Sequence, residues 1–148
     1  MNKYIELRNK HEKEFNDFPK SFAFSRQQFK EGMENLGLTE KDIDKVFSIG
    51  HGGFIRKTDV EACVKMCENH KNEIWDAINN DKTGEAFIYD MFSFELANHE
   101  FIITGEVTDT LDALNITNED LEKNKNLSHG LELACKNQYN LDNEDIKI

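Results

Sequence analysis

Long apolar runs are absent from this chain of 148 residues. No segment approaches the roughly 18 apolar residues that a membrane-spanning helix requires, so we expect no membrane span. Met1 to Phe18 carries charged residues throughout and lacks the apolar centre of a secretory signal. Cysteine is scarce, and an odd count of three argues against a closed disulfide framework and for a reducing compartment. We therefore expect a cytoplasmic protein.

Basic residues are also few. The chain has 18 Lys and Arg against 29 Asp and Glu, a net charge of −11. Nucleic-acid binding relies on Lys and Arg to displace counterions, so direct contact with DNA or RNA is not expected, and an anionic membrane surface would be repelled as well. An acidic surface can bind a basic protein face, capture cations or simply keep the chain soluble, and solubility is the favoured interpretation of the charge taken by itself.

Helix starts are well marked. A hydroxyl residue followed three positions later by an acid or amide, as in a capping box, occurs four times: Ser25 with Gln28, Thr39 with Asp42, Thr58 with Glu61 and Thr117 with Asp120. Apolar residues recur at helical spacing between these points. Together the two patterns predict helices over residues 3–17, 26–36, 40–48, 59–79, 86–99, 108–114 and 118–136.

Evidence for strands is limited to three short apolar runs, Ser21–Phe24, Gly53–Ile55 and Phe101–Thr104. The predicted fold class is therefore mainly α, with six or seven helices and a minor β element of two or three short strands. No linker is long enough to divide the chain, so residues 1–135 are predicted to form a single compact domain. Residues 136–148 are polar, and we expect them to fray.

The segment Asn79–Asp90 matches the register of an EF-hand calcium loop, with Gly84 at the sixth position. Its candidate metal ligands are Asn79, Asp81, Thr83, Glu85 and Asp90. Two departures weaken the match, because Ala86 replaces the usual branched apolar residue and the twelfth position is Asp instead of Glu. The neighbouring segment Ser48–Asp59 could pair with it, but glycines fill its third and fifth positions. We therefore favour a helix stop at Gly84, with calcium as the alternative cofactor.

A glycine-rich loop contains His51, Gly52, Gly53 and Arg56. Its backbone N–H groups could cradle a phosphate beside the Arg56 guanidinium. The spacing fits neither the P-loop nor the dinucleotide-binding fingerprint, however. The favoured interpretation is a flexible interhelical turn whose glycines adopt positive φ.

The densest polar cluster predicted on a helix contains Glu95, His99 and Glu100. Glu95 and His99 are four residues apart and can touch, as an acid and base pair or as two metal ligands. This is the basis of an alternative function as a metal-dependent enzyme. A solvated helix face with one ion pair is the favoured interpretation, because no second histidine lies in register.

Cys63, Cys67 and His70 lie within one broad face of a predicted helix. Thiolate and imidazole ligands could bind zinc. Both cysteines fall in the apolar stripe of that helix, so packing as small hydrophobic side chains is favoured.

Several longer motifs are distinctive when taken together: Phe22–Leu38, Gly52–Asp59, Asp81–Phe92, Glu95–Glu100 and Thr108–Leu114. With these motifs the chain resembles a group of small uncharacterised proteins encoded by bacteriophages and other mobile elements of Gram-positive bacteria. The resemblance covers roughly residues 11–135 and brings no catalytic residues. It implies an accessory protein that acts in the host cytoplasm by binding a host factor.

The sequence as a whole contains no coherent catalytic set. We therefore expect a non-enzymatic accessory protein without a cofactor, which binds a host protein through an acidic surface. The alternatives are a degenerate calcium-binding protein and a metal-dependent enzyme that uses Glu95 and His99. The oligomeric state stays open.

Overall fold

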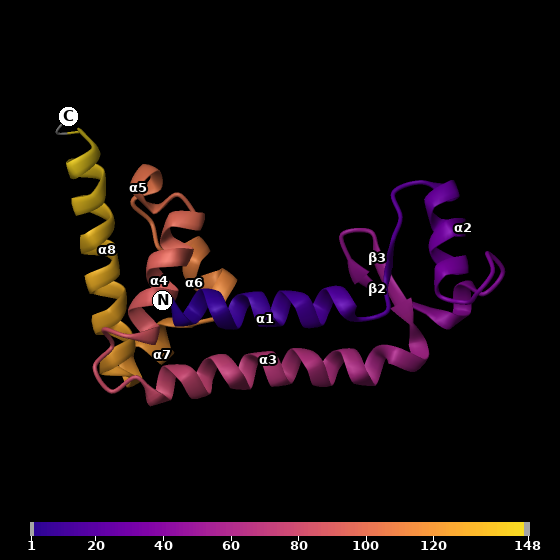
Figure 1. Cartoon of the computed structure of the whole chain (residues 1–148), viewed down its shortest axis with the longest axis horizontal. Coiled ribbons are helices and arrows are strands. Elements are labelled where there is room, and N and C mark those ends of the chain that lie inside the picture. The colour runs from indigo at the N-terminus through magenta and orange to yellow at the C-terminus, as the bar shows by residue number, and fades with distance from the viewer. Residues whose placement is uncertain (1, 147–148) are drawn as a thin grey trace. The chain divides into compact units, whose positions relative to one another are not determined.

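A computed structural model describes the backbone of residues 2–146 and the side chains of residues 2–140. Eight α-helices, two short 3-10 helices and three strands follow one another along the described chain (Figure 1). The predicted mainly helical fold class with a minor sheet is confirmed. In order, the elements are α1 Lys3–Asp17, β1 Ser21–Phe22, α2 Arg26–Asn35, η1 Ile43–Lys45, β2 Val46–Gly50, β3 Gly53–Arg56, η2 Lys57–Asp59, α3 Val60–Asn80, α4 Phe87–Asn98, α5 Phe101–Thr104, α6 Thr108–Leu114, α7 Asn118–Lys123 and α8 Lys125–Ile146.

Two compact units are present. Unit 1 contains Met1–Asn9 and Glu73–Ile148, and unit 2 contains Lys10–Asn72. The boundaries between them fall inside α1 and α3, so no linker separates the units. Of the four predicted capping pairs, two form as expected. Ser25 Oγ accepts a hydrogen bond from the backbone of Gln28, and Thr117 with Asp120 closes a complete capping box at the start of α7.

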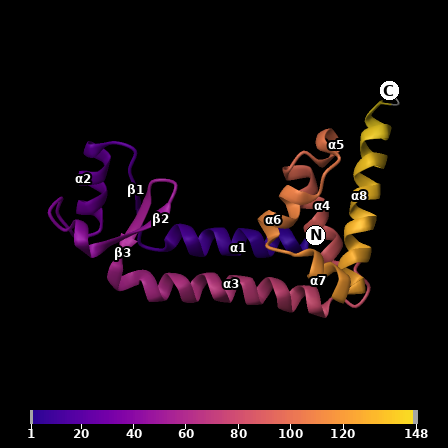
Figure 2. The same cartoon turned by 180° about the vertical axis from the view of Figure 1, so that it is seen from behind.

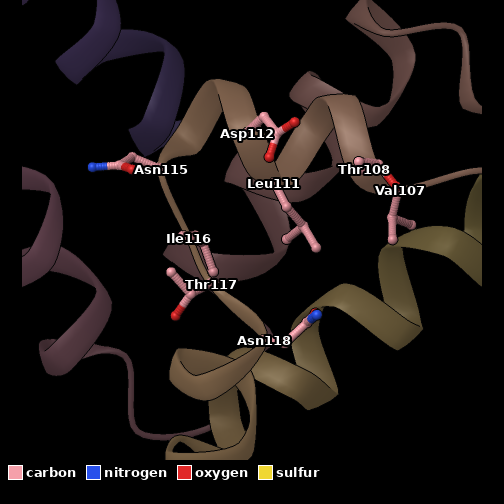
Figure 3. Close-up of a pocket in the computed structure, with 8 residues that line it drawn as sticks. All are labelled: Val107, Thr108, Leu111, Asp112, Asn115, Ile116, Thr117 and Asn118. Atoms are coloured by element: carbon pink, nitrogen blue, oxygen red, sulfur yellow. The ribbon is translucent and has the colours of Figure 1, made fainter.

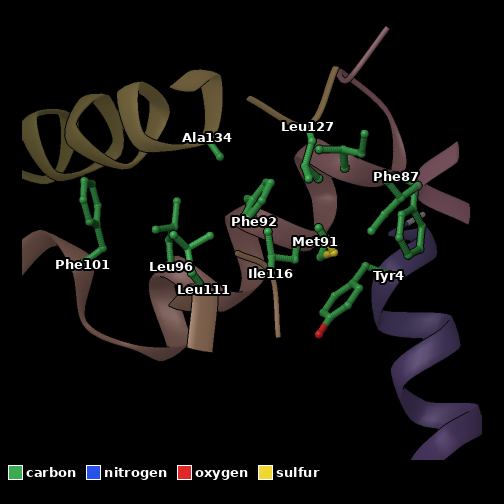
Figure 4. Close-up of a cluster of buried hydrophobic side chains, with 12 residues drawn as sticks. Tyr4, Phe87, Met91, Phe92, Leu96, Phe101, Leu111, Ile116, Leu127 and Ala134 are labelled. Atoms are coloured by element: carbon green, nitrogen blue, oxygen red, sulfur yellow. The ribbon is translucent and has the colours of Figure 1, made fainter. Parts of the chain in front are cut away.

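Helix α4 is at the centre of unit 1. Its sequence is apolar on nearly every side, which is the pattern of a helix buried all round. Ile88, Met91, Phe92 and Leu96 have no exposed surface. Figures 1 and 2 both show α8 running beside α4, and Figure 4 shows the buried cluster that these helices form with α6 and with Tyr4 of α1.

Two glycines allow α4 and α8 to approach closely. Gly84 precedes α4 with a φ of 81°, and a Cβ added there would overlap the backbone of Asn126. A Cβ added at Gly130 of α8 would overlap the Ile88 side chain and the Gly84 carbonyl oxygen. Gly84 lies in the connection between two helices, but the predicted helix stop at this residue is wrong, because α3 already ends at Asn80. The turn at Gly84 packs directly against α8.

Unit 2 contains a three-stranded antiparallel sheet in the order β1-β3-β2. One face of this sheet packs on α2, where Phe54 of β3 joins Met33 and Leu36 in a small buried cluster. Phe29 adds a ring 5.2 Å from that of Phe54. The Ser21 hydroxyl donates to the Gly32 carbonyl oxygen over 2.9 Å and fixes β1 against the same helix.

The predicted helix over residues 40–48 is wrong. Asp42 does accept hydrogen bonds from the backbone and hydroxyl of Thr39, but only the single turn η1 follows. The next residues, Val46–Gly50, pair with β3 as strand β2. Branched and aromatic side chains favour an extended backbone when a partner strand is present, and this pairing outweighs the helix-start signal.

The predicted strand Phe101–Thr104 is the single-turn helix α5. Thr104 and Gly105 donate their N–H groups to Glu100 and Phe101, which closes the turn locally. Phe101 is 4% exposed and contacts the Tyr139 ring of α8 at 5.3 Å. Burial of this ring against α8 and the local hydrogen bonds both favour the helical turn over a strand.

The helix predicted over residues 118–136 is divided at Asn124. Its side-chain oxygen accepts hydrogen bonds from the N–H groups of Asn126 and Leu127, both over 3.1 Å, and starts α8. Helix α8 continues to Ile146, although we predicted a frayed tail from residue 136. Residues 147 and 148 of that predicted tail lie outside the described part.

Substitution of Gly130 by alanine tests the contact between α4 and α8. Alanine inside a helix normally stabilises by about 0.5–1 kcal/mol relative to glycine. Here we expect a loss of about 2 kcal/mol or more, because the new methyl group collides with Ile88 and with backbone. Urea unfolding of the two proteins measures the difference. A stability equal to or above that of the wild type would contradict the close approach.

Candidate functional site

The charge of the chain is divided unequally between the two units. Unit 2 has 11 Lys and Arg against 11 Asp and Glu, so its net charge is zero. Unit 1 has 7 Lys and Arg against 18 Asp and Glu, so it carries the whole net charge of −11. The net negative charge of this protein is therefore a property of unit 1.

Within unit 1 the acidity is concentrated in one continuous stretch. Between Lys82 and Lys123 the sequence contains ten Asp and Glu and no Lys or Arg. We call its second half, Glu100–Glu122, the acidic segment; it comprises α5, α6, most of α7 and their connections. Its exposed carboxylates are Glu100, Glu106, Asp109, Asp112, Glu119 and Glu122.

A pocket of about 430 Å³ lies along α6 and the turn into α7 (Figure 3). Its lining combines apolar and polar groups: Val107, Thr108, Leu111, Asp112, Asn115, Ile116, Thr117 and Asn118. The capping box at Thr117 and Asp120 orders the far end of this turn. The pocket thus gives the acidic segment a hollow with a mixed apolar and polar lining that includes Asp112.

Ile103 is a second apolar feature of the acidic segment. Its side chain on α5 is 79% exposed, while its neighbour Phe101 is buried. Protein interfaces combine apolar anchor residues with a polar or charged rim. An exposed isoleucine among carboxylates matches that composition.

Glu95 is the centre of the polar cluster predicted on α4, and it is buried, with 5% of its surface exposed. The Tyr4 hydroxyl of α1 donates to Glu95 Oε1 over 2.8 Å. Arg8 Nε lies 3.7 Å from the same oxygen, and its guanidinium is 5.0 Å from the centre of the Phe94 ring. The favoured interpretation of a solvated helix face is therefore wrong for Glu95.

The predicted proximity of Glu95 and His99 is observed. His99 Nδ1 lies 3.5 Å from Glu95 Oε2 and 2.8 Å from the Glu95 carbonyl oxygen. The buried Thr110 hydroxyl of α6 donates to this carbonyl oxygen over 3.4 Å. Glu100 does not join them, since it is exposed and has a left-handed φ of 55°.

Burial raises the pKa of Tyr4 well above its usual value, and the nearby Glu95 carboxylate raises it further, while Arg8 opposes the shift. Tyr4 therefore stays protonated and keeps its donor aimed at Glu95. A carboxylate engaged with tyrosine, arginine and histidine side chains joins α1 to α4. The Glu95 backbone carbonyl oxygen accepts a hydrogen bond from the Thr110 hydroxyl of α6. This geometry is that of a structural clamp.

The calcium-like window centres on Asp81, which is also buried, with 7% of its surface exposed. One carboxylate oxygen accepts from the backbone and hydroxyl of Thr83 and from the N–H of Gly84. The other accepts from the N–H groups of Ala86 and Ile88 over 3.1 and 3.0 Å. Five donors saturate the lone pairs that a cation would need. Asp81 thus anchors the loop and caps the first turn of α4.

The other candidate metal ligands do not converge on Asp81. Asn79 is exposed on the last turn of α3, and Asp90 lies half-buried on α4. Glu85 pairs with His129 of α8 over 3.0 Å, and the Thr83 hydroxyl accepts from the Glu85 N–H. Throughout the residues that the structure describes, no group of three or more His, Cys, Asp or Glu side chains is placed to hold a metal ion.

The glycine-rich loop is the turn of the β2–β3 hairpin, so the predicted interhelical location is wrong. The predicted positive φ is present at Gly50 and Gly52, with values of 87° and 79°, but not at Gly53, which is the first residue of β3. His51 also has a positive φ, of 51°. His51 is exposed. Arg56 does not face the turn as a free cation, because its Nε lies 2.8 Å from Asp59 Oδ2.

The predicted packing of Cys63 and Cys67 in a core is not observed. Cys67 is exposed and Cys63 half-buried on α3. Burial raises the pKa of the Cys63 thiol, and the neighbouring Cys67 adds to the shift. His70 Nε2 instead lies 2.8 Å from Glu14 Oε2, and its ring stacks on His11 with 3.9 Å between centroids.

The comparison with known families covers almost the entire chain. The model of DUF7659, a family of unknown function, matches residues 3–137. The chain belongs to the DUF7659 family. No curated protein and no solved structure matches it. Among the described residues of this DUF7659 protein, no helix has the length and apolar character needed to cross a membrane.

Some functional features of the DUF7659 chain escape a sequence-only interpretation. Tyr4 and Thr110 lie 91 and 15 residues from Glu95, and no local pattern connects such positions. The acidic segment, in contrast, has a signal in the sequence. The missing Lys and Arg between Lys82 and Lys123 could have located it.

Replacement of Asp81 by alanine should lower the free energy of unfolding by about 2–4 kcal/mol, because four backbone N–H groups lose their acceptor. Burial tends to raise the pKa of Asp81, but donors from Ile88, Gly84, Thr83 and Ala86 outweigh it and lower the pKa. The carboxylate's contribution is therefore present above the usual Asp pKa of about 4 and is lost as the pH falls below it.

Urea unfolding between acidic and neutral pH measures both effects, with Asp90→Asn as the matched control. We expect the control to behave like the wild type. The anchor role would be wrong if calcium raised the melting temperature of the wild type and both substitutions abolished that increase.

Replacement of Tyr4 by phenylalanine removes the donor to Glu95 and should cost about 1–3 kcal/mol. Because the pKa of Tyr4 is raised, its contribution is complete below the usual tyrosine pKa of about 10 and is lost as the pH rises above it. Chemical unfolding from neutral to alkaline pH should show a shallower decline in the variant. Tyr139→Phe, at a ring that is 47% exposed, is the control and should change little. Equal effects of the two substitutions would refute the clamp.

Proposed function

We propose that this DUF7659 protein is a non-enzymatic accessory protein whose acidic segment binds a basic surface on a partner protein. The observation that carries the proposal is the confinement of the whole net charge to unit 1. If the charge served only solubility, we would expect it to be spread over both units, but the 63 residues of unit 2 have no net charge. A charge used for binding gathers on one part of the molecule.

The acidic segment offers more than charge. Its pocket has Leu111 and Ile116 in the lining, and Ile103 is exposed on α5. The aliphatic stem of a lysine or arginine can pack on such apolar surface while its charged end meets a carboxylate. A basic protein segment would therefore find both kinds of contact, with Asp112 at the rim of the pocket.

The state of Glu95 supports a non-enzymatic role. A catalytic carboxylate must reach a substrate, whereas Glu95 is buried and engaged with Tyr4, Arg8 and His99. Asp81 is likewise engaged with its own loop. Asp81 and Glu95, the buried carboxylates among the described side chains of unit 1, thus serve the fold that carries the acidic segment.

The origin of the partner follows from the resemblance described above. A protein similar to products of bacteriophages and mobile elements would act in the cytoplasm of the host cell. Its partner would then be a host protein with a basic surface, such as one that itself binds nucleic acid. Direct binding of nucleic acid by the acidic segment would be opposed by like charge.

The proposal can be tested with a decalysine peptide as a defined basic probe. Binding of the peptide, measured by fluorescence anisotropy, should weaken steeply as the salt concentration rises to about 0.5 M, because salt screens the attraction between exposed charges. The combined variant Glu106→Gln, Asp109→Asn and Asp112→Asn should bind at least about tenfold more weakly, a change of about 1.4 kcal/mol. Capture from host lysate with wild type and variant then identifies the physiological partner.

The control removes the same number of charges from unit 2, through Glu34→Gln, Glu61→Gln and Glu68→Gln. These exposed residues lie on α2 and α3. The control should retain wild-type affinity. If both triple variants lose affinity equally, the net charge and not the acidic segment governs binding, and the proposal fails.

A further inference from the structure

Helix α3 carries two thiols about one turn apart. Cys63 and Cys67 are separated by four residues on this unbroken helix of 21 residues (Figure 1). Residues at this spacing are neighbours on one face of a helix. Cys67 is exposed and Cys63 is half-buried, and neither belongs to the hydrophobic clusters that the structure describes. Packing in a core therefore does not account for the pair.

The two thiols lie close enough to influence each other. Burial is the largest cause of the raised pKa of Cys63, and the charge of Cys67 and a hydrogen bond with Cys67 raise this pKa further. Val64, between them in the sequence, is 52% exposed, so this part of α3 is open to solvent. An ion that arrives from solvent can therefore meet both sulfur atoms.

The geometry of the helix opposes a disulfide between the two cysteines. Cβ atoms four residues apart on a helix are about 5–6 Å from each other. A disulfide requires about 3.5–4.5 Å between them, so α3 would have to deform. A bridging ion is less demanding, because two metal–sulfur bonds of about 2.3 Å hold the sulfur atoms up to about 4.6 Å apart. The spacing suits an ion shared by both sulfur atoms better than a direct S–S bond.

The ligand set identifies the class of ion. Thiolates are soft ligands that select soft ions such as Cu(I). Structural zinc requires four ligands, but among the residues that the structure describes no third His, Cys, Asp or Glu side chain joins the two thiols. His70, on the next turn of α3, has its Nε2 2.8 Å from Glu14 Oε2 and its ring stacked on His11. Cu(I) is satisfied by two thiolates in a nearly linear arrangement, and so fits this pair.

We propose that Cys63 and Cys67 form a binding site for one Cu(I) ion on unit 2. Each thiol releases its proton to solvent and forms one metal–sulfur bond, so an ion of charge +1 and two thiolates of charge −1 form a complex of net charge −1. The exposed Cys67 gives the ion a path from solvent, and Cys63 then completes the chelate. This site is separate from the proposed partner binding, because the acidic segment belongs to unit 1.

Anaerobic titration of the full chain with Cu(I) tests the site. Ascorbate keeps the copper reduced, and bicinchoninate serves as a coloured competing chelator. The wild type should withdraw one Cu(I) per chain from this chelator. At pH values where both thiols are protonated, the apparent affinity should rise about a hundredfold per pH unit, because two protons leave for each ion bound.

Serine substitution of either cysteine removes one of the two bonds. Cys63→Ser and Cys67→Ser should each weaken Cu(I) binding at least about a hundredfold, because the second bond of a chelate forms at a high effective concentration. Neither side chain is fully buried, so both variants should keep their helices, which circular dichroism verifies. Cys135→Ser is the matched control, because this third cysteine is half-buried in unit 1. It should bind Cu(I) like the wild type.

Three results would overturn the proposal. The first is a wild type that takes no copper from bicinchoninate. The second is a Cys63→Ser variant that binds as tightly as the wild type, since Cys67 alone would then hold the ion without a chelate. The third is a loss of affinity in Cys135→Ser equal to that in the other two variants, which would show that binding does not depend on the position of the thiols.

Discussion

The carboxylate of Asp81 is the interaction on which the arrangement of unit 1 depends. It accepts the N–H groups of Thr83, Gly84 and Ala86 in the connection between α3 and α4, and that of Ile88 in the first turn of α4. The same connection packs on α8 through Gly84, and the Asn126 side chain donates to the Asp81 carbonyl oxygen. A buried charge is costly unless it is hydrogen-bonded, so this loop has few other conformations available.

Helix α4 illustrates how buried carboxylates orient an otherwise featureless element. Its apolar surface fits many rotations about its own axis, because nearly every side is hydrophobic. Asp81 fixes its beginning, and Glu95 near its end allows only rotations that face Tyr4 and Arg8 of α1. Hydrophobic burial thus supplies most of the stabilisation, and the two acids select one packing.

The sequence predicts this fold well wherever local signals and burial agree. The bounds of α1 and α6 are those predicted, and the capping box at Thr117 forms. Prediction fails where a contact with another element favours a conformation that the local sequence does not indicate. Val46–Gly50 is a strand because it pairs with β3, and Phe101, in a helical turn, packs against Tyr139 of α8. For the same reason the contact between Glu95 and His99 is predictable from helical spacing, while the donor from Tyr4 is not.

The stretch without Lys or Arg between Lys82 and Lys123 has a chemical consequence of its own. Trypsin has no site within it, so α4, α5, α6 and α7 leave the protein as one large peptide. Lysine acetylation and ubiquitination have no acceptor there, and amine-directed cross-linkers cannot label it. Regulation of this region inside a cell must therefore act through other residue types, and mapping of its contacts requires reagents that couple to carboxylates.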